Sequence, residues 1–360
     1  MPKPEMKPVL KWAGGKSQII DQLTSKMPKK YNNYFEPFIG GGAVFLAVAP
    51  QKAVINDINE QLINLYRQLR EHPEEVIEVI RGLDAVPCDK TFYYDTRSRY
   101  NGKIERRELD AECAALMIWI NKHCFNGLYR VNGKGLFNVP YNNKVGGASI
   151  NEENVRAIAN YLQSADVTIS CCDFEERCTD VAKDDFVYLD SPYVPVSNTA
   201  NFTDYTKDGF TYEDHKRLAA LFRELDSIGA KLMLSNNDVP LVHSLYDGFN
   251  IQSLDVKRMI NRNASKRTSR EVIITNYNED QSMNRTAPSD ELMDLLLEQW
   301  GDLTPEERQQ FSMADAEDWV HDRKLYEQEH GIIPRGYEVS EVYAIIQDFN
   351  STYGVNDGAD

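Results

Sequence analysis

Six short runs rich in β-branched and aromatic residues occur in the first 277 residues, and each ends in a polar or glycine-rich turn. They cover residues 34–38, 53–56, 167–171, 186–189, 231–235 and 272–277. Between two of these runs, residues 213–229 carry apolar side chains at helical spacing. Thr211 and Asp214 are placed to form a capping box before this helix, and Gly229 lies where a C-terminal cap belongs. Strands that alternate with helices predict an α/β fold, a mainly parallel sheet covered by helices on both faces.

The stretch from residue 61 to 160 interrupts this alternation. It contains helical segments near residues 61–81 and 109–121, followed by a loop over residues 126–147 that is rich in glycine and asparagine. We interpret this stretch as an inserted, mostly helical module. After residue 277, a polar linker leads into acidic segments with a helical pattern. The predicted organisation is a discontinuous domain of residues 1–60 plus 161–277, an inserted domain of residues 61–160, and an acidic helical extension of residues 278–360.

The net charge of −16 is concentrated at the C-terminal end. Residues 278–360 hold 20 acidic and 5 basic side chains, so residues 1–277 are close to neutral, and a nucleic-acid partner is not excluded. The sequence has no run of 18 apolar residues and no charged-then-apolar leader, so we expect no membrane span or secretion signal. The six cysteines lack zinc-type spacing and the six histidines are scattered. This pattern predicts no metal site and is typical of a reducing, cytoplasmic compartment.

One predicted strand is followed at once by a carboxylate and an aromatic ring. The apolar run of residues 186–189 leads into Asp190, Ser191, Pro192 and Tyr193. In open α/β sheets, ligands bind outside the carboxyl ends of the strands, where this turn would lie. A carboxylate, a backbone carbonyl and a ring face on one turn are suited to holding an exocyclic amine, most simply that of a nucleobase.

A glycine-rich turn after the first predicted strand indicates a second part of the same site. Residues 38–42 read Phe-Ile-Gly-Gly-Gly and precede an apolar helix, so the backbone can approach a ligand closely there. Asp57 follows the next strand, where an acidic residue binds ribose hydroxyls in nucleotide-binding folds. Together they favour a nucleoside-type cofactor. The Gly-Lys-Ser of residues 15–17 imitates a phosphate-binding loop, but that motif needs glycine where Leu10 stands, which argues against a nucleoside triphosphatase.

Several motifs occur in an order that resembles a known family. They are residues 11–16 (Lys-Trp-Ala-Gly-Gly-Lys), 35–42 (Phe-Glu-Pro-Phe-Ile-Gly-Gly-Gly), 125–130, 137–140, 190–193 and 198–202. Over residues 7–277 they resemble the Dam family, the DNA adenine-N6 methyltransferases of the alpha or D12 class. The resemblance implies a Rossmann-like sheet that binds S-adenosyl-L-methionine, with residues 61–160 as the DNA target-recognition domain. It also implies site-specific methylation of adenine N6 in double-stranded DNA. The acidic extension lies outside the resemblance.

The resemblance also implies roles for individual residues. Asp190 and the carbonyl of Ser191, beside Pro192, would accept hydrogen bonds from the target amine, and Tyr193 would stack on a flipped-out base. The family usually has proline where Ser191 stands, and serine supplies the same backbone carbonyl. S-adenosylmethionine would contact Trp12, Lys16, Phe38, Gly40, Gly42, Asp57, Asp173, Phe174 and Asp190. DNA would contact Lys11, Phe125, Asn126, Leu128, Arg130, Asn138, Pro140, Lys266 and Arg267.

Two basic stretches favour DNA as the partner. The loop of residues 126–144 carries Arg130 among glycine, asparagine and aromatic residues, and arginine is the usual bidentate reader of guanine. Six cations lie within residues 257–270, around an Asn-Arg-Asn-Ala-Ser segment typical of phosphate contacts. Arg130 and residues 137–140 are compatible with GATC, the sequence that Dam-like enzymes often modify.

Two other interpretations stay open at the level of sequence. A methyltransferase of the same fold could act on RNA or on a protein amide, although the inserted module with Arg130 favours DNA. A scaffold weakened at Ser191 could bind DNA without turnover. We expect a cytoplasmic protein of a bacterium, or of a virus acting in a bacterial host, that is a monomer or a weak dimer on DNA. The acidic extension could bind a partner that the sequence does not identify.

Overall fold

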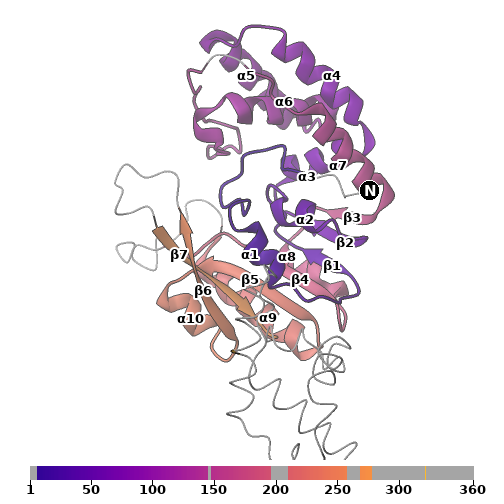
Figure 1. Ribbon diagram of the computed structural model, residues 1–360. Coiled ribbons are helices and arrows are strands. Elements are labelled where there is room, and N and C mark those ends of the chain that lie inside the picture. The colour runs from indigo at the N-terminus through magenta and orange to yellow at the C-terminus, as the bar shows by residue number, and fades with distance from the viewer. Residues whose placement is uncertain (1–5, 145–146, 196–209, 258–267, 278–320, 322–360) are drawn as a thin grey trace, which may run out of the picture. The chain divides into compact units, whose positions relative to one another are not determined.

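The described strands form one seven-stranded sheet in the order β3-β2-β1-β4-β5-β7-β6 (Figure 1). The computed structural model describes residues 6–144, 147–195, 210–257, 268–277 and 321. The strands are β1 (Tyr34–Glu36), β2 (Lys52–Asn56), β3 (Asp166–Ser170), β4 (Phe186–Leu189), β5 (Lys231–Asn237), β6 (Asn250–Lys257) and β7 (Thr268–Thr275). Neighbours from β3 to β5 pair in parallel, whereas β7 pairs antiparallel with both β5 and β6. The predicted α/β fold with a mainly parallel, Rossmann-like sheet is confirmed.

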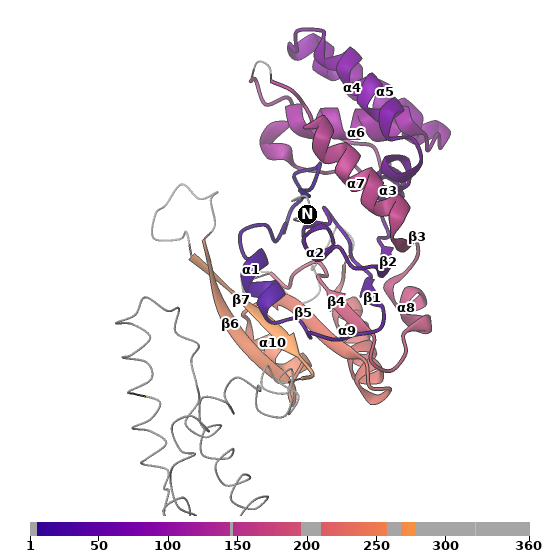
Figure 2. The same cartoon turned by 45° about the vertical axis from the view of Figure 1, so that its right-hand side comes forward.

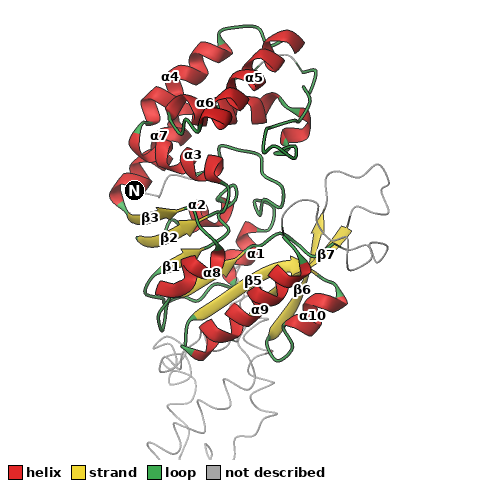
Figure 3. Ribbon diagram, turned by 180° about the vertical axis from the view of Figure 1, so that it is seen from behind, coloured by secondary structure: helices red, strands yellow, loops and turns green. Residues whose placement is uncertain are grey.

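Helices cover the two faces of the sheet and extend beyond its β3 edge (Figure 3). The described α-helices are α1 (Ile20–Ser25), α2 (Ala43–Val48), α3 (Glu60–Glu71), α4 (Pro73–Asp84), α5 (Lys90–Arg106), α6 (Ala111–His123), α7 (Glu152–Ser164), α8 (Phe174–Arg177), α9 (Tyr212–Ser227) and α10 (Pro240–Leu245). All the strands and helices named here belong to a compact unit of residues 1–282.

Strand β4 shows how the sheet is buried on both sides. All four of its residues are fully buried. Phe186 and Tyr188 join an apolar cluster that includes helix α2, whereas Val187 and Leu189 join a second cluster that includes helix α9. Because successive strand residues point to opposite faces, the two clusters are the cores on the two faces of the sheet. The continuous apolar run therefore marks a central parallel strand.

The helices α3 to α7 lie between β2 and β3 in the sequence and form a layer beyond β3 (Figure 2). Helices α3 and α7 contact β3, and α6 contacts α3, α4 and α5. Their buried residues belong to the same apolar cluster as Phe186 and Tyr188 of the sheet. The inserted helices thus share a continuous core with one face of the sheet.

Local sequence signals explain where the inserted helices begin. The side chains that cap α3, α5, α6 and α7 are those of Asn59, Asp89, Asp110 and Asn151. Helix α3 ends at Glu71, and the backbone of the next residue, His72, leaves the helical region (φ −134°, ψ 46°) because Pro73 follows it. The helical region predicted near residues 61–81 is accordingly two helices.

Other boundaries confirm or extend the sequence-based expectations. The capping box of Thr211 and Asp214 is present, and Gly229 follows the end of α9 with a φ of +87°. Strand β6 was not predicted, because its sequence mixes polar and apolar residues without strict alternation; it lies at the edge of the sheet, paired only with β7. No described helix has the length and apolar character needed to cross a membrane. Parts of the predicted organisation lie outside the described residues, namely residues 198–202, 258–267 and, apart from His321, the acidic extension.

Candidate active site

Asp190 lies directly after β4, at the carboxyl end of the parallel strands. Its Oδ1 atom is 2.7 Å from Nζ of Lys16 and accepts a hydrogen bond of 2.8 Å from Oγ of Ser235 on β5. The side chain of Lys16 is 4% exposed and that of Asp190 is 20% exposed. Because water reaches this ion pair poorly, the two charges interact more strongly than they would at the surface. The fold thus joins two predicted site residues that are far apart in the sequence.

Tyr193 lies beside the same lysine. Nζ of Lys16 is 4.7 Å from the centroid of the Tyr193 ring, which is a cation–π distance. The Tyr193 hydroxyl donates a hydrogen bond of 3.1 Å to Oε2 of Glu271 on β7. Burial raises the pKa of Tyr193 well above its ordinary value, so its hydroxyl stays protonated and able to donate. Lys16 therefore contacts both predicted catalytic side chains, Asp190 and Tyr193.

Side chains at the end of β5 anchor the turn after β4. Asn236 accepts a hydrogen bond of 3.0 Å from the backbone N–H of Val194, and Asn237 donates one of 2.6 Å to the Val194 carbonyl. Ser191 is 2% exposed, so this turn is packed where the family usually has proline. Sequence patterns did not single out Ser235, Asn236 or Asn237. Their signal was three consecutive polar residues at the end of an otherwise apolar strand.

The glycine turn before α2 is packed against two aromatic side chains. Gly40 and Gly42 have φ angles of +48° and +70°, which glycine adopts without strain. A Cβ atom at Gly40 would lie 3.0 Å from the Trp12 ring, and one at Gly42 would lie 2.4 Å from the hydroxyl of Tyr66. That hydroxyl donates a hydrogen bond of 3.0 Å to the carbonyl of Gly40. The turn therefore has no room for larger side chains on these two glycines.

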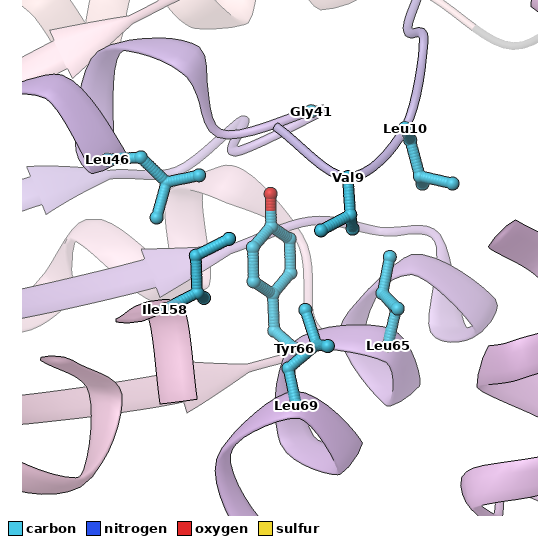
Figure 4. Close-up of a pocket in the computed structure, with 8 residues that line it drawn as sticks. All are labelled: Val9, Leu10, Gly41, Leu46, Leu65, Tyr66, Leu69 and Ile158. Carbon is cyan, nitrogen blue, oxygen red and sulfur yellow. The ribbon is translucent and has the colours of Figure 1, made fainter. Parts of the chain in front are cut away.

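A small apolar cavity lies next to this turn, and the side chain of Tyr66 is one of those that line it (Figure 4). Its volume is about 10 Å³, which is about one water-sized probe and far too small for a nucleoside. The lining residues are Val9, Leu10, Gly41, Leu46, Leu65, Tyr66, Leu69 and Ile158. We assign this cavity to packing.

Asp57 connects the glycine turn to the end of β2. Its two carboxylate oxygens accept hydrogen bonds from the backbone N–H groups of Gly40, at 3.1 Å, and Asn59, at 3.0 Å. Burial raises the pKa of Asp57 above its ordinary value, opposed by these hydrogen bonds. The next residue, Ile58, is 75% exposed, which is unusual for a large apolar side chain at the end of a buried strand. Sequence patterns did not single out Ile58.

Asp173 and Phe174 lie after β3, at the start of the short helix α8. The Phe174 ring centroid is 5.3 Å from that of Phe38, which precedes the glycine turn. The carboxylate of Asp173 contacts Arg217 of α9 at 2.8 Å. The structure thus brings Phe38, Asp173 and Phe174 together, as the predicted cofactor set requires.

Glu36 is a buried acid for which sequence patterns indicated no role. It is 2% exposed and accepts a hydrogen bond of 2.6 Å from the Tyr34 hydroxyl. Burial raises the pKa of Glu36 well above its ordinary value; the charge of Asp190 adds to this rise, and the Tyr34 hydrogen bond and Lys16 oppose it. The carboxylate of Asp190 thus belongs to a larger polar cluster.

Within the described part of the chain, no three or more histidine, cysteine, aspartate or glutamate side chains are grouped to hold a metal ion.

Lys11 lies next to the loop that follows α6. The side chain of Asn121 donates to the carbonyls of Lys11 and Gly127, both at 3.0 Å, and accepts a hydrogen bond from the Lys11 N–H. A Cβ atom at Gly127 would lie 2.6 Å from the Lys11 side chain. Phe125 and Leu128 of this loop are 51% and 39% exposed, respectively. The structure thus brings together Lys11 and a loop with two exposed apolar side chains.

Arg130 and Asn138 face each other across a short hairpin. Nε of Arg130 donates a hydrogen bond of 2.7 Å to Oδ1 of Asn138. A second hydrogen bond, of 2.8 Å from the Phe125 N–H to the Pro140 carbonyl, connects the two ends of this region. One connected loop region therefore holds six of the nine predicted DNA contacts, and Lys11 lies beside it. The six are Phe125, Asn126, Leu128, Arg130, Asn138 and Pro140. Lys266 and Arg267, the other two predicted DNA contacts, lie outside the described residues.

Comparison with known proteins identifies the relatives of this chain. The family model described as D12 class N6 adenine-specific DNA methyltransferase matches residues 12–260. The Type II methyltransferase M1.LlaDCHI of Lactococcus lactis is 44% identical over 280 residues, which cover 76% of this chain and 97% of that protein. The Type II methyltransferase M.MjaIII of Methanocaldococcus jannaschii is 41% identical over 76% of this chain and 100% of that protein. The DNA adenine methylase of Haemophilus influenzae is 33% identical over 74% of this chain and 92% of that protein.

Proposed function

We propose a specific reaction from the premise that the chain belongs to the D12 class of N6 adenine-specific DNA methyltransferases. In this reaction, a methyl group moves from S-adenosylmethionine to N6 of an adenine flipped out of duplex DNA. The observation that carries the proposal is the position of Asp190. This residue lies at the carboxyl end of a central strand, and its Oδ1 atom is 2.7 Å from Nζ of the buried Lys16. The ring of Tyr193 packs against the same ammonium group.

The residues around the glycine turn fit the cofactor. S-adenosylmethionine supplies an electrophilic methyl group on a sulfonium. We assign Trp12, Lys16 and the turn of Gly40 and Gly42 to its amino-acid part, because a backbone without Cβ atoms can approach a ligand closely and the Trp12 ring packs against this turn. Asp57 would bind the ribose hydroxyls. Phe38, Asp173 and Phe174 would enclose the adenine ring. We add Ile58 to this group because its side chain is 75% exposed beside Asp57. Asp190 would lie between the cofactor and the target base.

Asp190 and Ser191 would prepare the target amine. The lone pair of adenine N6 is delocalised into the ring, which makes the nitrogen a poor nucleophile. Two acceptors aligned with its N–H bonds, the Asp190 carboxylate and the Ser191 carbonyl, would favour a pyramidal nitrogen. The carboxylate would also stabilise the positive charge that develops on N6. Because the turn is anchored to β5 by Asn236 and Asn237, serine at position 191 can present this carbonyl without the usual proline.

Tyr193 would bind the ring of the flipped base. Extruding a base costs a few kcal/mol, and stacking on an aromatic ring returns about 1–3 kcal/mol per base. The hydrogen bond to Glu271 fixes the Tyr193 hydroxyl and so favours one orientation of the ring. This stacking surface would offset part of the cost of base flipping.

The inserted helices and their loop would read the DNA. Phe125 and Leu128 are exposed apolar side chains that could fill the space left by the flipped adenine. Arg130, paired with Asn138, would read guanine, and Lys11 lies beside the same loop. We propose GATC as the recognition sequence and residues 61–160 as the recognition domain.

Mapping modified bases would test this function. The chain and its Asp190→Ala variant are expressed in a host without adenine methylation, and the plasmid DNA is sequenced for N6-methyladenine. We expect methylation at a single short motif containing GATC, dependent on Asp190. Unmodified plasmid from cells containing the folded wild-type chain would refute the reaction, and methylation at another motif would refute GATC alone.

A further inference from the structure

Arg217 of α9 connects three acidic side chains and one aromatic ring at the edge of the proposed cofactor site. Its Nη2 atom is 2.8 Å from Oδ1 of Asp173 and 2.7 Å from Oε2 of Glu175. Its Nη1 atom is 2.9 Å from Oδ1 of Asp214. The centre of its guanidinium lies 4.9 Å from the centroid of the Phe174 ring. One side chain therefore contacts both Asp173 and Phe174.

These contacts fix the orientation of the Asp173 carboxylate. Oδ1 of Asp173 also accepts a hydrogen bond of 3.0 Å from the Glu175 N–H at the start of α8. Arg217 is held in turn by Asp214, whose other oxygen accepts hydrogen bonds of 2.7 Å from the N–H and the hydroxyl of Thr211 in the capping box. Both donors to Asp173 use Oδ1, so the start of α8 and Arg217 of α9 together orient this carboxylate and leave Oδ2 for a ligand.

We infer that Arg217 is a positioning residue that makes the cofactor site selective for an adenine base. The inference rests on the proposed function, in which Asp173 and Phe174 flank the adenine of the cofactor. A carboxylate only accepts hydrogen bonds, so it favours the exocyclic amine of adenine and disfavours the oxygen that hypoxanthine carries at the same place. Arg217 holds this acceptor in place and stacks on the Phe174 ring at the same time.

The network is poorly suited to a purely structural role. The side chains of Arg217, Asp173 and Glu175 are 40%, 41% and 42% exposed. Ion pairs exposed to this degree contribute little to the stability of the fold. We therefore expect variants at position 217 to fold, so that binding can be measured directly.

The test measures dissociation constants of the full chain by calorimetry for S-adenosylhomocysteine and S-inosylhomocysteine, which differ in the amine. Wild type is compared with Arg217→Met, Arg217→Lys and Asp173→Asn. Arg223→Met is the matched control, because Arg223 lies on the same helix and donates to the carbonyls of Ala219 and Leu245. We expect wild type and the control to prefer the adenosyl ligand. Arg217→Met should weaken adenosyl binding about tenfold and inosyl binding much less, since losing a hydrogen bond to a charged group is worth about one decade or more.

The outcomes separate this inference from the proposed function. If Asp173→Asn loses the preference and Arg217→Met keeps it, Arg217 does not position Asp173, while the cofactor assignment stands. An equal loss of affinity for both ligands in Arg217→Met would show a structural role and overturn the inference. A wild type that binds neither ligand, or both equally, would overturn the cofactor assignment and the inference with it. If Arg217→Met does not fold, the same measurement is made on Arg217→Lys, which keeps the positive charge but lacks the planar guanidinium. An unchanged preference of Arg217→Lys for the adenosyl ligand would then overturn the inference.

Discussion

Replacing Asp190 by alanine would separate two roles of this side chain, in stability and in catalysis. The substitution leaves the ammonium of Lys16, which is 4% exposed, without its partner at 2.7 Å. Deleting one member of a buried ion pair costs about 3–5 kcal/mol. Asp190 is itself 20% exposed, and the Glu36 carboxyl also acts on Lys16. We therefore expect the free energy of unfolding to fall by about 2–3 kcal/mol, at or below the lower end of that range.

The double variant Lys16→Met with Asp190→Ala distinguishes the two roles. Removing the ammonium that has lost its carboxylate partner should restore about 1 kcal/mol or more of the lost stability, because an apolar pair can replace a buried ion pair at little cost. Methyl transfer should stay at least about 10³-fold below wild type, since the group that stabilises charge on N6 is still missing.

Two measurements check this expectation. Urea unfolding gives the stability of wild type, both single variants and the double variant, and transfer of a labelled methyl group to duplex DNA gives the activity. A double variant no more stable than Asp190→Ala would show that Lys16 and Asp190 are not paired. Near-wild-type transfer by Asp190→Ala would refute the catalytic role.

Four further predictions concern the turn, the stacking ring, the buried acid and the DNA surface. Gly42→Ala should lower the free energy of unfolding by about 2 kcal/mol, because Gly42 has a φ of +70° and a Cβ atom there would lie 2.4 Å from the Tyr66 hydroxyl oxygen. Urea unfolding measures the change. The control is Gly82→Ala, which should be neutral or stabilising because a Cβ atom at Gly82 meets open space. Tyr193→Phe should keep most of the single-turnover activity on duplex DNA, because the aromatic ring remains. Tyr193→Ala should lose about 1–3 kcal/mol of base stacking and a corresponding part of this activity. An equal loss of activity in the two variants would contradict the stacking role. Burial raises the pKa of Glu36, so the folded protein holds the carboxyl proton more tightly than the unfolded chain does. Wild type should therefore lose stability relative to Glu36→Gln as pH rises from the ordinary carboxyl range up to the raised pKa. A stability difference that stays constant between pH 4 and 8, to within about 0.3 kcal/mol, would oppose this assignment. The logarithm of the DNA association constant should fall steeply as the logarithm of the salt concentration rises. A flat dependence would show that the basic side chains of residues 257–270 do not neutralise DNA phosphates.

The sheet could be predicted because its central strands carry a local signal. Residues 186–189 are apolar throughout, and the structure shows that both faces of this strand are buried. The capping box of Thr211 and Asp214 is equally local and was predicted correctly. Strand β6 was missed because an edge strand needs no strict pattern, and its pairing with β7 is decided by the tertiary fold.

The candidate site could be predicted only in part. Motifs identified Lys16 and Asp190, but nothing in the sequence indicates that the two side chains lie 2.7 Å apart. Ser235 and Arg217 were missed because each acts through a neighbour, Asp190 or Asp173, that only the fold brings near. Ile58 was missed because an isolated isoleucine after a strand is ordinary in sequence, and only its 75% exposure marks it.

The core shared by the inserted helices and the sheet limits how enzymes of this build can diversify. Helices α3 to α7 bury their apolar side chains in the same cluster as Phe186 and Tyr188 of the central strand. Replacing all the helices α3 to α7 by those of a relative with another target sequence would remove side chains that pack against one face of the sheet. The new core residues would not match the volume and shape of that face. Phe137 and Val139 of the outer hairpin belong to this cluster, but changes confined to the exposed residues 130–135 of the hairpin disturb no such interior. Natural drift in target preference should therefore concentrate in that hairpin, and laboratory libraries built there should retain folded members far more often than exchanges of the complete insert.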